Sequence, residues 1–274
     1  MSVAVEITIH TRRGWQWLDL RELWDYHELL GFLVWRDIKV RYKQTMLGAV
    51  WALLQPLIGM FVFGALFTKV AHIETPGIPY SLFVFAGLVP WTFFSNALSF
   101  SSASLVGSEQ MIRKIYFPRL FVPLASILAL GIDMLIGLGF TVLLMVYYRW
   151  HLTASVLWLP VCLAGLFMST SGLGLIFSAL NVRYRDVKYA LPFLIQTSFF
   201  LTPVVYPSRY VPDRFKMLLG LNPMAGIIEG FRHVLLGTPL SSVVVATSAV
   251  VSVSLFLCGL LYFHRMERSF ADII

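Results

Sequence analysis

The chain has 274 residues, of which 58% are hydrophobic and only 13% charged, and its mean hydropathy is +0.77. Soluble domains carry about 25% charged residues, so this composition excludes an ordinary water-soluble fold. The formal charge of +7 does not indicate nucleic-acid binding, because the Lys and Arg residues lie between apolar runs and form no basic stripe with a nucleic-acid motif. The two cysteines also lie inside apolar runs, without metal-ligand spacing.

The amino-terminal region predicts an amphipathic helix. The first 44 residues carry seven Lys or Arg and lack the early apolar core of a cleavable signal, so we expect this end to stay in the cytoplasm. Apolar residues recur at helical spacing from Leu20 to Val34, with charged residues between them. Four tryptophans between positions 15 and 35 favour a helix in the membrane interface over a soluble helix packed on a partner.

Apolar runs long enough to cross a hydrocarbon core of about 30 Å recur six times, which predicts an all-α integral membrane protein with six transmembrane helices. The runs cover residues 47–68, 80–106, 120–148, 152–180, 189–205 and 240–263. An even number of spans returns the chain to its starting side. Of the 21 Lys and Arg residues, 15 fall on the predicted cytoplasmic side and six on the other, as the positive-inside distribution requires. Both termini should therefore be cytoplasmic.

The expected organisation has three parts. Residues 1–46 form a cytoplasmic tail and the interfacial amphipathic helix, residues 47–263 form the six-span transmembrane domain, and residues 264–274 form a cytoplasmic tail. Four prolines interrupt the apolar segment at about 206–240. We expect re-entrant helices there, before the last span, because non-helical backbone at membrane depth is tolerated only inside protein or beside a cavity.

Charged residues within or beside apolar runs need partners. Asp133 lies in the middle of the third run, where a carboxylate costs about 2.5 to 3.5 kcal/mol on insertion scales. We expect it to form a structural hydrogen bond to a neighbouring helix, and a proton relay is the alternative. Glu229 and Arg232, three residues apart in the outer segment, are candidates for a local ion pair.

The segment before the first run carries Arg36, Lys39 and Lys43 at helical spacing, which positive-inside anchoring alone would explain. Together with later segments, however, it resembles type 2 ABC exporter permeases of the family that moves O-antigen, capsule or teichoic acid chains. The segments that carry this resemblance are 36–45 (RDIKVRYKQT), 87–91 (GLVPW), 112–119 (IRKIYFPR), 184–187 (YRDV), 202–206 (TPVVY), 222–223 (NP), 231–232 (FR) and 270–272 (FAD).

The resemblance implies a transport subunit of the bacterial inner membrane and not an enzyme. Two copies of the chain would form a homodimer around a channel, with two copies of a separate ATPase subunit docked beneath. The chain contains no G-x-x-x-x-G-K-[ST] phosphate loop, so we expect ATP and Mg to be bound by that partner and no cofactor or metal by this chain. The expected cargo is lipid-linked O-antigen, and capsule, teichoic acid, a small molecule or a lipid are the alternatives. A membrane transferase and a secondary transporter are disfavoured, because neither D-x-D strings nor inverted repeats are found.

Three groups of candidate functional residues follow. The lipid pyrophosphate head would be captured by cations at the end of the amphipathic helix, since cations attract phosphates. The glycan would pass aromatic side chains of the first and fifth spans, which could equally be packing residues. The loop at 107–119 would receive the motion of the ATPase, because it combines charges with an exposed apolar pair, and interfacial anchoring is the plain alternative. The groups are Lys39, Arg41 and Lys43 for capture; Phe61, Phe63, Phe199, Phe200 and Tyr206 for the channel; and Glu109, Arg113, Lys114, Tyr116, Phe117, Arg119, Arg185 and Asp186 for coupling, where the last two could instead pair with each other.

Overall fold

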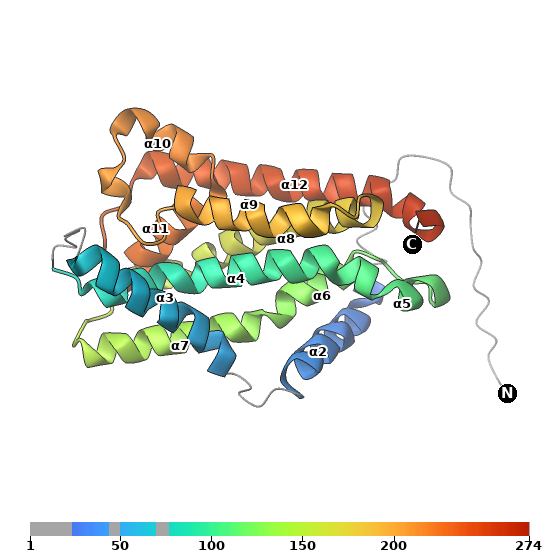
Figure 1. Cartoon of the computed structure of the whole chain (residues 1–274), viewed down its shortest axis with the longest axis horizontal. Coiled ribbons are helices and arrows are strands. Elements are labelled where there is room, and N and C mark those ends of the chain that lie inside the picture. Colours follow the sequence, from blue (N-terminus) through green and yellow to red (C-terminus); the bar gives the residue numbers. More distant parts are fainter. Residues whose placement is uncertain (1–23, 44–49, 70–76, 274) are drawn as a thin grey trace.

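A computed structural model describes residues 24–43, 50–69 and 77–273, which form helices and connecting loops but no strand. Trp15, Trp17 and the predicted start of the first span at Leu47 lie outside these residues. The long helices run side by side along one axis (Figure 1). The helices are α2 (His27–Lys43), α3 (Val50–Lys69), α4 (Tyr80–Gly107), α5 (Glu109–Lys114), α6 (Phe121–Ala129), α7 (Gly131–Tyr147), α8 (Leu159–Arg183), α9 (Val187–Leu201), α10 (Asp213–Gly220), α11 (Pro223–Leu236) and α12 (Ser242–Ile273), with 3-10 turns η1 (Ala154–Trp158) and η2 (Ser208–Tyr210).

Five stretches are long and apolar enough to cross a membrane, which confirms the predicted all-helical membrane protein. They are α3, α4, α6 with α7, η1 with α8, and α12. The fifth predicted span corresponds to α9, which has only 15 residues and is therefore about 22 Å long, less than the hydrocarbon thickness of about 30 Å. It ends at Leu201, and the chain continues without helix through Pro203 and Pro207. Proline lacks the amide hydrogen that a continuing helix needs.

The third predicted span is broken. Leu130 ends α6 and precedes α7, with φ −75° and ψ −9°, so the apolar run bends at this point. Asp133 consequently lies in the first turn of α7 instead of in the middle of one straight helix. The last helix is longer than predicted, because α12 continues to Ile273, ten residues beyond the predicted end of the span at Phe263.

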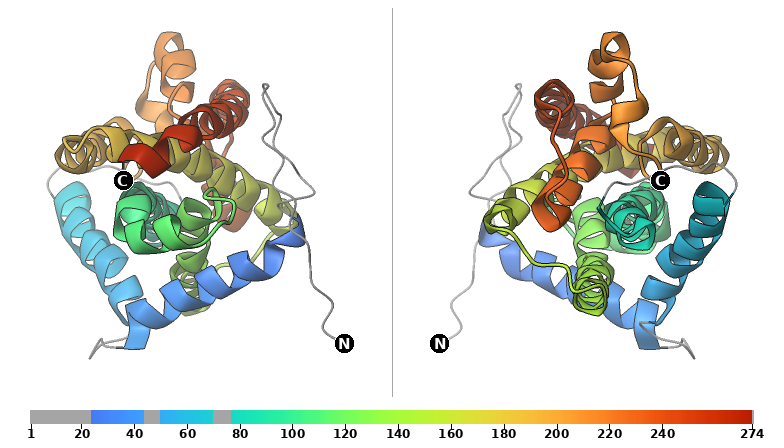
Figure 2. Two further views of the ribbon diagram at one scale, coloured as in Figure 1. Left: turned by 90° about the vertical axis from the view of Figure 1, so that its right-hand side faces the viewer. Right: turned by 90° about the vertical axis from the view of Figure 1, so that its left-hand side faces the viewer.

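Helix α4 is the centre of the bundle. Seen end-on, it lies among the other long helices (Figure 2), and it contacts α3, α6, α7, α8, α9 and α11. Most of its residues are buried, from Leu82 near one end to Leu105 near the other. An α-helix that is apolar all round is typical of such a fully surrounded position.

Helices α8 and α12 approach each other closely along a seam of small residues. A Cβ added at Gly172 would collide with the backbone of Leu255, and one added at Gly259 would collide with the backbone of Gly172. The Ser169 and Ser252 hydroxyls are hydrogen-bonded across the same seam at 2.8 Å. Small residues of this kind let helix backbones pack directly inside a membrane.

Helix α2 lies across the outside of the bundle and packs on α6 (Figure 2). Its inner side buries Leu33 against Phe121 and Ala125, while Phe32 and Trp35 remain exposed. The part of the predicted amphipathic segment that the structure describes is therefore helical from His27, with an apolar contact to the protein on one side and exposed aromatic residues on another, and its predicted start at Leu20 lies outside the described residues. Exposed aromatic side chains of this kind favour the membrane interface.

At the opposite end of the bundle from α5, Arg232 of α11 holds the non-helical backbone that follows α9 (Figure 1). Its guanidinium donates to the carbonyls of Pro203, at 2.7 Å, of Val204, and of Phe83, at 3.1 Å. The Tyr80 hydroxyl donates to the next carbonyl, that of Val205, at 2.7 Å. Side chains thus supply the donors that this backbone would otherwise obtain from a helix or from water.

The suggested ion pair between Glu229 and Arg232 is not formed among the described residues. Both side chains are buried, but Arg232 donates to backbone carbonyls, whereas one Glu229 oxygen accepts from the Ser208 hydroxyl and the Ser241 amide, each at 3.0 Å. Glu229 thereby ties α11 to the segment before α10 and to the start of α12. The two charged residues therefore have separate structural partners, although helical spacing places them close together.

Arg232→Met should destabilise the protein, because about 1 to 3 kcal/mol is lost for each buried carbonyl left without a donor. The measurement is the thermal unfolding midpoint of the purified protein in detergent. Arg214→Met is the matched control, since Arg214 is exposed on α10. Equal midpoints for the two variants would show that Arg232 does not stabilise the end of the bundle that contains α11.

Candidate functional site

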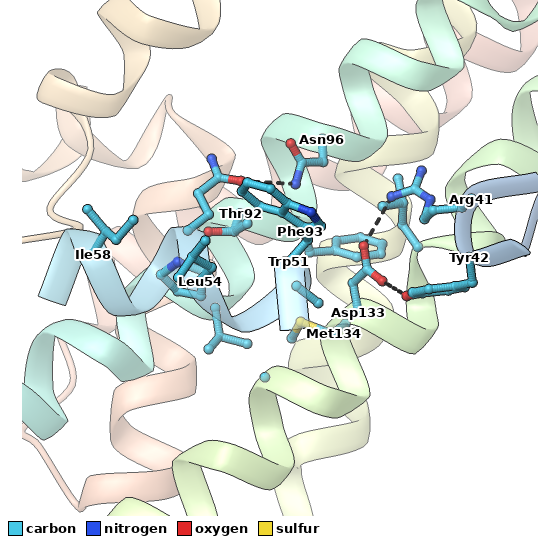
Figure 3. A pocket seen from close by; sticks show the side chains of 16 residues that line it. Arg41, Tyr42, Trp51, Leu54, Ile58, Thr92, Phe93, Asn96, Asp133 and Met134 are labelled. Atoms are coloured by element: carbon cyan, nitrogen blue, oxygen red, sulfur yellow. Dashed lines mark hydrogen bonds and ion pairs between the residues drawn. The ribbon is translucent and has the colours of Figure 1, made fainter. Parts of the chain in front are cut away.

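A cavity of about 540 Å³ lies between α2, α3, α4 and α7, and we call it the main cavity (Figure 3). Its walls are mostly apolar, with polar groups at Gln55, Thr92 and Asn96. The Asn96 amide donates to the Gln55 side-chain oxygen at 3.5 Å. The lining residues are Arg41, Tyr42, Trp51, Ala52, Leu54, Gln55, Pro56, Ile58, Val89, Thr92, Phe93, Asn96, Leu130, Asp133, Met134 and Gly137. A mostly apolar hollow with a few convergent polar groups is typical of a ligand site.

Asp133 lies at one end of the main cavity, where two consecutive residues of α2 bind its two carboxylate oxygens (Figure 3). Arg41 forms an ion pair with it, with 3.1 Å between Nη1 and Oδ2, and the Tyr42 hydroxyl donates to Oδ1. The expected hydrogen bond to a neighbouring helix is therefore confirmed, and its partner is the amphipathic helix. Burial, and then the hydrogen bond to Asp133, raise the pKa of the Tyr42 hydroxyl, so it remains a donor at neutral pH.

Arg41 also borders a hollow of about 470 Å³ between α2, α6 and the end of α4, which we call the second hollow. The Arg41 guanidinium lies 4.3 Å from the ring centroid of Phe100. The lining of the second hollow is mostly apolar, and its polar groups are the hydroxyls of Ser104, Ser108 and Ser126 and the ion pair of Arg36 and Asp37. Arg41 therefore lies between two mostly apolar hollows.

The structure separates the three residues predicted to capture a lipid pyrophosphate. Lys39 and Lys43 are exposed on one side of α2, and the Lys39 ammonium lies 5.3 Å from the Trp35 ring centroid. Arg41 points the other way, into the protein, because residues two positions apart in an α-helix lie about 200° apart. Two of the three cations thus share a surface, and the third belongs to the cavity.

The predicted channel residues form a partly exposed aromatic group at α3 and α9. The rings of Phe63 and Phe199 lie 5.5 Å apart, which joins the two helices, while Phe61 and Phe200 are exposed to 69% and 66%. Tyr206 is half-buried in the loop after α9. The structure therefore brings Phe63 and Phe199 together and leaves Phe61 and Phe200 facing outwards.

The predicted coupling loop contains one exposed and one buried aromatic residue. Tyr116 is 79% exposed, but Phe117 is only 5% exposed. Phe117 belongs to an apolar cluster with Phe263 and Phe270 of α12, so the prediction that both aromatics are exposed is wrong for Phe117. Sequence alone did not indicate that the end of α12 folds back over this loop.

The charged residues of the loop have local partners. Glu109 and Arg113 form an ion pair of 2.9 Å along α5. The Arg119 guanidinium donates to the Glu267 carbonyl at 2.6 Å, and its amide donates to the Glu267 carboxylate at 3.1 Å. Lys114 is exposed beside them. The loop is therefore bound to the carboxyl-terminal part of α12.

The second predicted coupling segment, at Arg185 and Asp186, lies at the start of α9 and is exposed. Asp186 occupies the N-cap position, but its side chain forms no capping hydrogen bond, and the two residues do not form an ion pair in the described part of the chain. This segment lies at the same end of the bundle as α5 and the end of α12 (Figure 1). Within the described ranges, no three His, Cys, Asp or Glu side chains gather as metal ligands.

Comparisons with known proteins identify the family. The sequence profile of the family described as ABC-2 type transporter matches residues 28–236. The O-antigen export system permease protein RfbA of Klebsiella pneumoniae is 29% identical over 248 residues, which cover 90% of this chain and 95% of that protein. RfbA of Myxococcus xanthus is 30% identical over 260 residues, with 93% and 98% covered. The polysialic acid transport protein KpsM of Escherichia coli is 26% identical over 199 residues, with 71% and 76% covered.

Phe117→Ala should lower stability by about 3 to 5 kcal/mol, because it empties a buried aromatic position. Tyr116→Ala should change stability little, since that ring is largely exposed. The unfolding midpoints of the two variants in detergent provide the comparison. Similar losses for both would contradict the different environments of the two rings.

Proposed function

Because the chain belongs to the ABC-2 type transporter family, we propose that it is the membrane permease of an ATP-driven exporter that moves lipid-linked polysaccharide, most closely O-antigen, across the bacterial inner membrane. The observation that carries this proposal is the similarity to O-antigen export permeases over 90% or more of the chain. Capsule is the second candidate, favoured by the similarity to KpsM. The chain is a transport subunit and not an enzyme, and ATP and Mg are bound by a separate ATPase subunit.

In this proposal the permease has six spans, with α9 as the short fifth span and α10 and α11 as re-entrant helices on the outer side. Both termini are cytoplasmic. The positive-inside distribution of the Lys and Arg residues supports this orientation, as does the placement of α5, the start of α9 and the end of α12 at one end of the bundle (Figure 1).

The exposed aromatic residues of α3 and α9 support a homodimer that encloses the channel. Phe61 and Phe200 face outwards beside the contact between Phe63 and Phe199. Aromatic faces stack on sugar rings and on other aromatic rings, so a second copy placed against this side would give the glycan an aromatic path. Two copies of the ATPase would then dock at the end that contains α5.

Coupling to the ATPase is assigned to α5 and the loop after it, with Arg185 and Asp186 beside them. Tyr116 offers an exposed aromatic side chain for docking, as interface anchors usually do. The bonds between Arg119 and Glu267 connect the same loop to α12, so a push on the loop reaches the last span directly.

Cells without this chain should lose O-antigen from their surface and accumulate the lipid-linked glycan inside. Export should return when the chain is supplied with its ATPase, but not with an ATPase whose phosphate-loop Lys is replaced. Immunoblots of surface and intracellular glycan provide the measurement. Loss of capsule with normal O-antigen would select the second candidate, and normal surface display of both glycans would reject polysaccharide export.

Tyr116→Ala should lower export per ATP hydrolysed by about fivefold, the effect of losing ~1 kcal/mol at a docking contact. Tyr147→Ala is the matched control, since Tyr147 is similarly exposed at the far end of α7. The measurement is glycan transport and ATP hydrolysis by the reconstituted complex. Equal coupling in the two variants would remove Tyr116 from the transmission of motion.

A further inference from the structure

The environment of Arg41 matches an amphiphile that carries phosphate between a lipid chain and a sugar. Arg41 lies between two mostly apolar hollows, of which the main cavity is the larger and the second carries three serine hydroxyls and the pair of Arg36 and Asp37. A planar guanidinium binds phosphate oxygens through several donors at once. A phosphate at Arg41 would therefore have suitable surroundings for its chain and for its sugar.

Asp133 already occupies this position as an anion of the protein. Its two oxygens accept from consecutive residues of α2, Arg41 and Tyr42. In the described part of the chain, Arg41 uses Nη1 for this bond, and its Nε and Nη2 donate to no protein group. The carboxylate thus holds α2 against α7 while it engages only part of the donor capacity of the guanidinium.

We infer that Asp133 is a built-in competitor for the headgroup: it holds Arg41 until a polyprenyl pyrophosphate displaces it, and the exchange releases α2 from α7. This inference rests on the proposed function and extends it, because it assigns the arrival of cargo to the breaking of one named contact. Asp133 acts through Arg41 and is a positioning residue.

The exchange is physically feasible in both directions. The side chains of Arg41 and Asp133 retain 24% and 17% exposure, so the pair keeps some contact with solvent, which weakens its attraction relative to a fully buried pair. A pyrophosphate carries more negative charge and more acceptor oxygens than a single carboxylate, which favours it at the guanidinium. When the headgroup leaves, the carboxylate is in place to recover Arg41 and Tyr42.

The central test is a double-mutant cycle on the full chain in complex with its ATPase subunits, in nanodiscs, with polyprenyl pyrophosphate as the probe. Asp133→Asn should tighten binding about fivefold, as expected when a competing partly exposed partner is removed. Arg41→Gln should weaken binding at least about tenfold, since a charge-assisted contact is lost. Asp213→Asn, which removes the carboxylate of the ion pair with Lys216 on α10, is the control for loss of charge.

The combined variant decides whether Asp133 acts through Arg41. If it does, Asp133→Asn should not increase the affinity for polyprenyl pyrophosphate in the Arg41→Gln background. The same fivefold gain in both backgrounds would overturn the inference, because Asp133 would then only repel anions in general. Should Arg41→Gln insert poorly, Arg41→Lys keeps the charge and loses the fork, so it should bind more weakly and still respond to Asp133→Asn.

Two further probes separate the headgroup from the chain. The affinity for inorganic pyrophosphate should increase on Asp133→Asn, and the affinity for polyprenol without phosphate should not change. A higher affinity for polyprenol in Asp133→Asn would overturn the inference. A higher affinity for inorganic pyrophosphate without one for polyprenyl pyrophosphate would also overturn it, because the ligand would then be soluble.

Hydrogen exchange provides a readout of α2 itself. Polyprenyl pyrophosphate should increase exchange over residues 27–43 of the wild type, and Asp133→Asn should show that increase without ligand. Hydrogen exchange in Asp133→Asn equal to that of the wild type would overturn the inference that Asp133 holds α2 against α7. Normal glycan export without lipid pyrophosphate binding would overturn this inference and leave the proposed function intact, whereas absence of polysaccharide export would reject the function itself.

Discussion

The backbone after α9 imposes the strictest condition on this fold, because the consecutive carbonyls of residues 203–205 have no helix or strand to pair with. Arg232 donates to the first two, and Tyr80 donates to the third. Unpaired carbonyls are costly in apolar surroundings, so α4, α9 and α11 can hold their positions only together. Gly87 is part of the same condition, since a Cβ there would collide with Arg232 and with the Val204 carbonyl. The end of the bundle that contains α11 is thus specified by hydrogen bonds.

The region around α2 is built differently. There, α2 is held by the Leu33 contact with α6 and by the partly exposed pair of Arg41 and Asp133. Removing the buried Arg232 guanidinium leaves backbone carbonyls without donors, whereas the pair of Arg41 and Asp133 keeps some contact with solvent. The two ends of the bundle therefore differ in how readily their charged contacts can be exchanged.

Sequence reasoning predicted the elements that depend on local composition, and it failed where distant segments meet. Apolar length identified the long spans, and the cost of a carboxylate at Asp133 correctly predicted a partner on another helix. The direction of Arg41 could also have been predicted, since residues two apart on a helix point to opposite sides. The burial of Phe117 could not, because it depends on α12 reaching back across about 150 positions to cover the loop. The bend at Leu130 carried no proline to reveal it.

The seam between α8 and α12 also limits how this protein can diverge. Any side chain at Gly172 or Gly259 would meet backbone of the facing helix, and backbone cannot move aside as a flexible side chain can. Gly172 and Gly259 therefore cannot be replaced by residues with a side chain, whereas residues that line the main cavity can be replaced by others of similar volume. The close approach of α8 and α12 therefore fixes the residue type at one point in each helix, whereas the cavity between α2, α3, α4 and α7 leaves a wider choice of side chains.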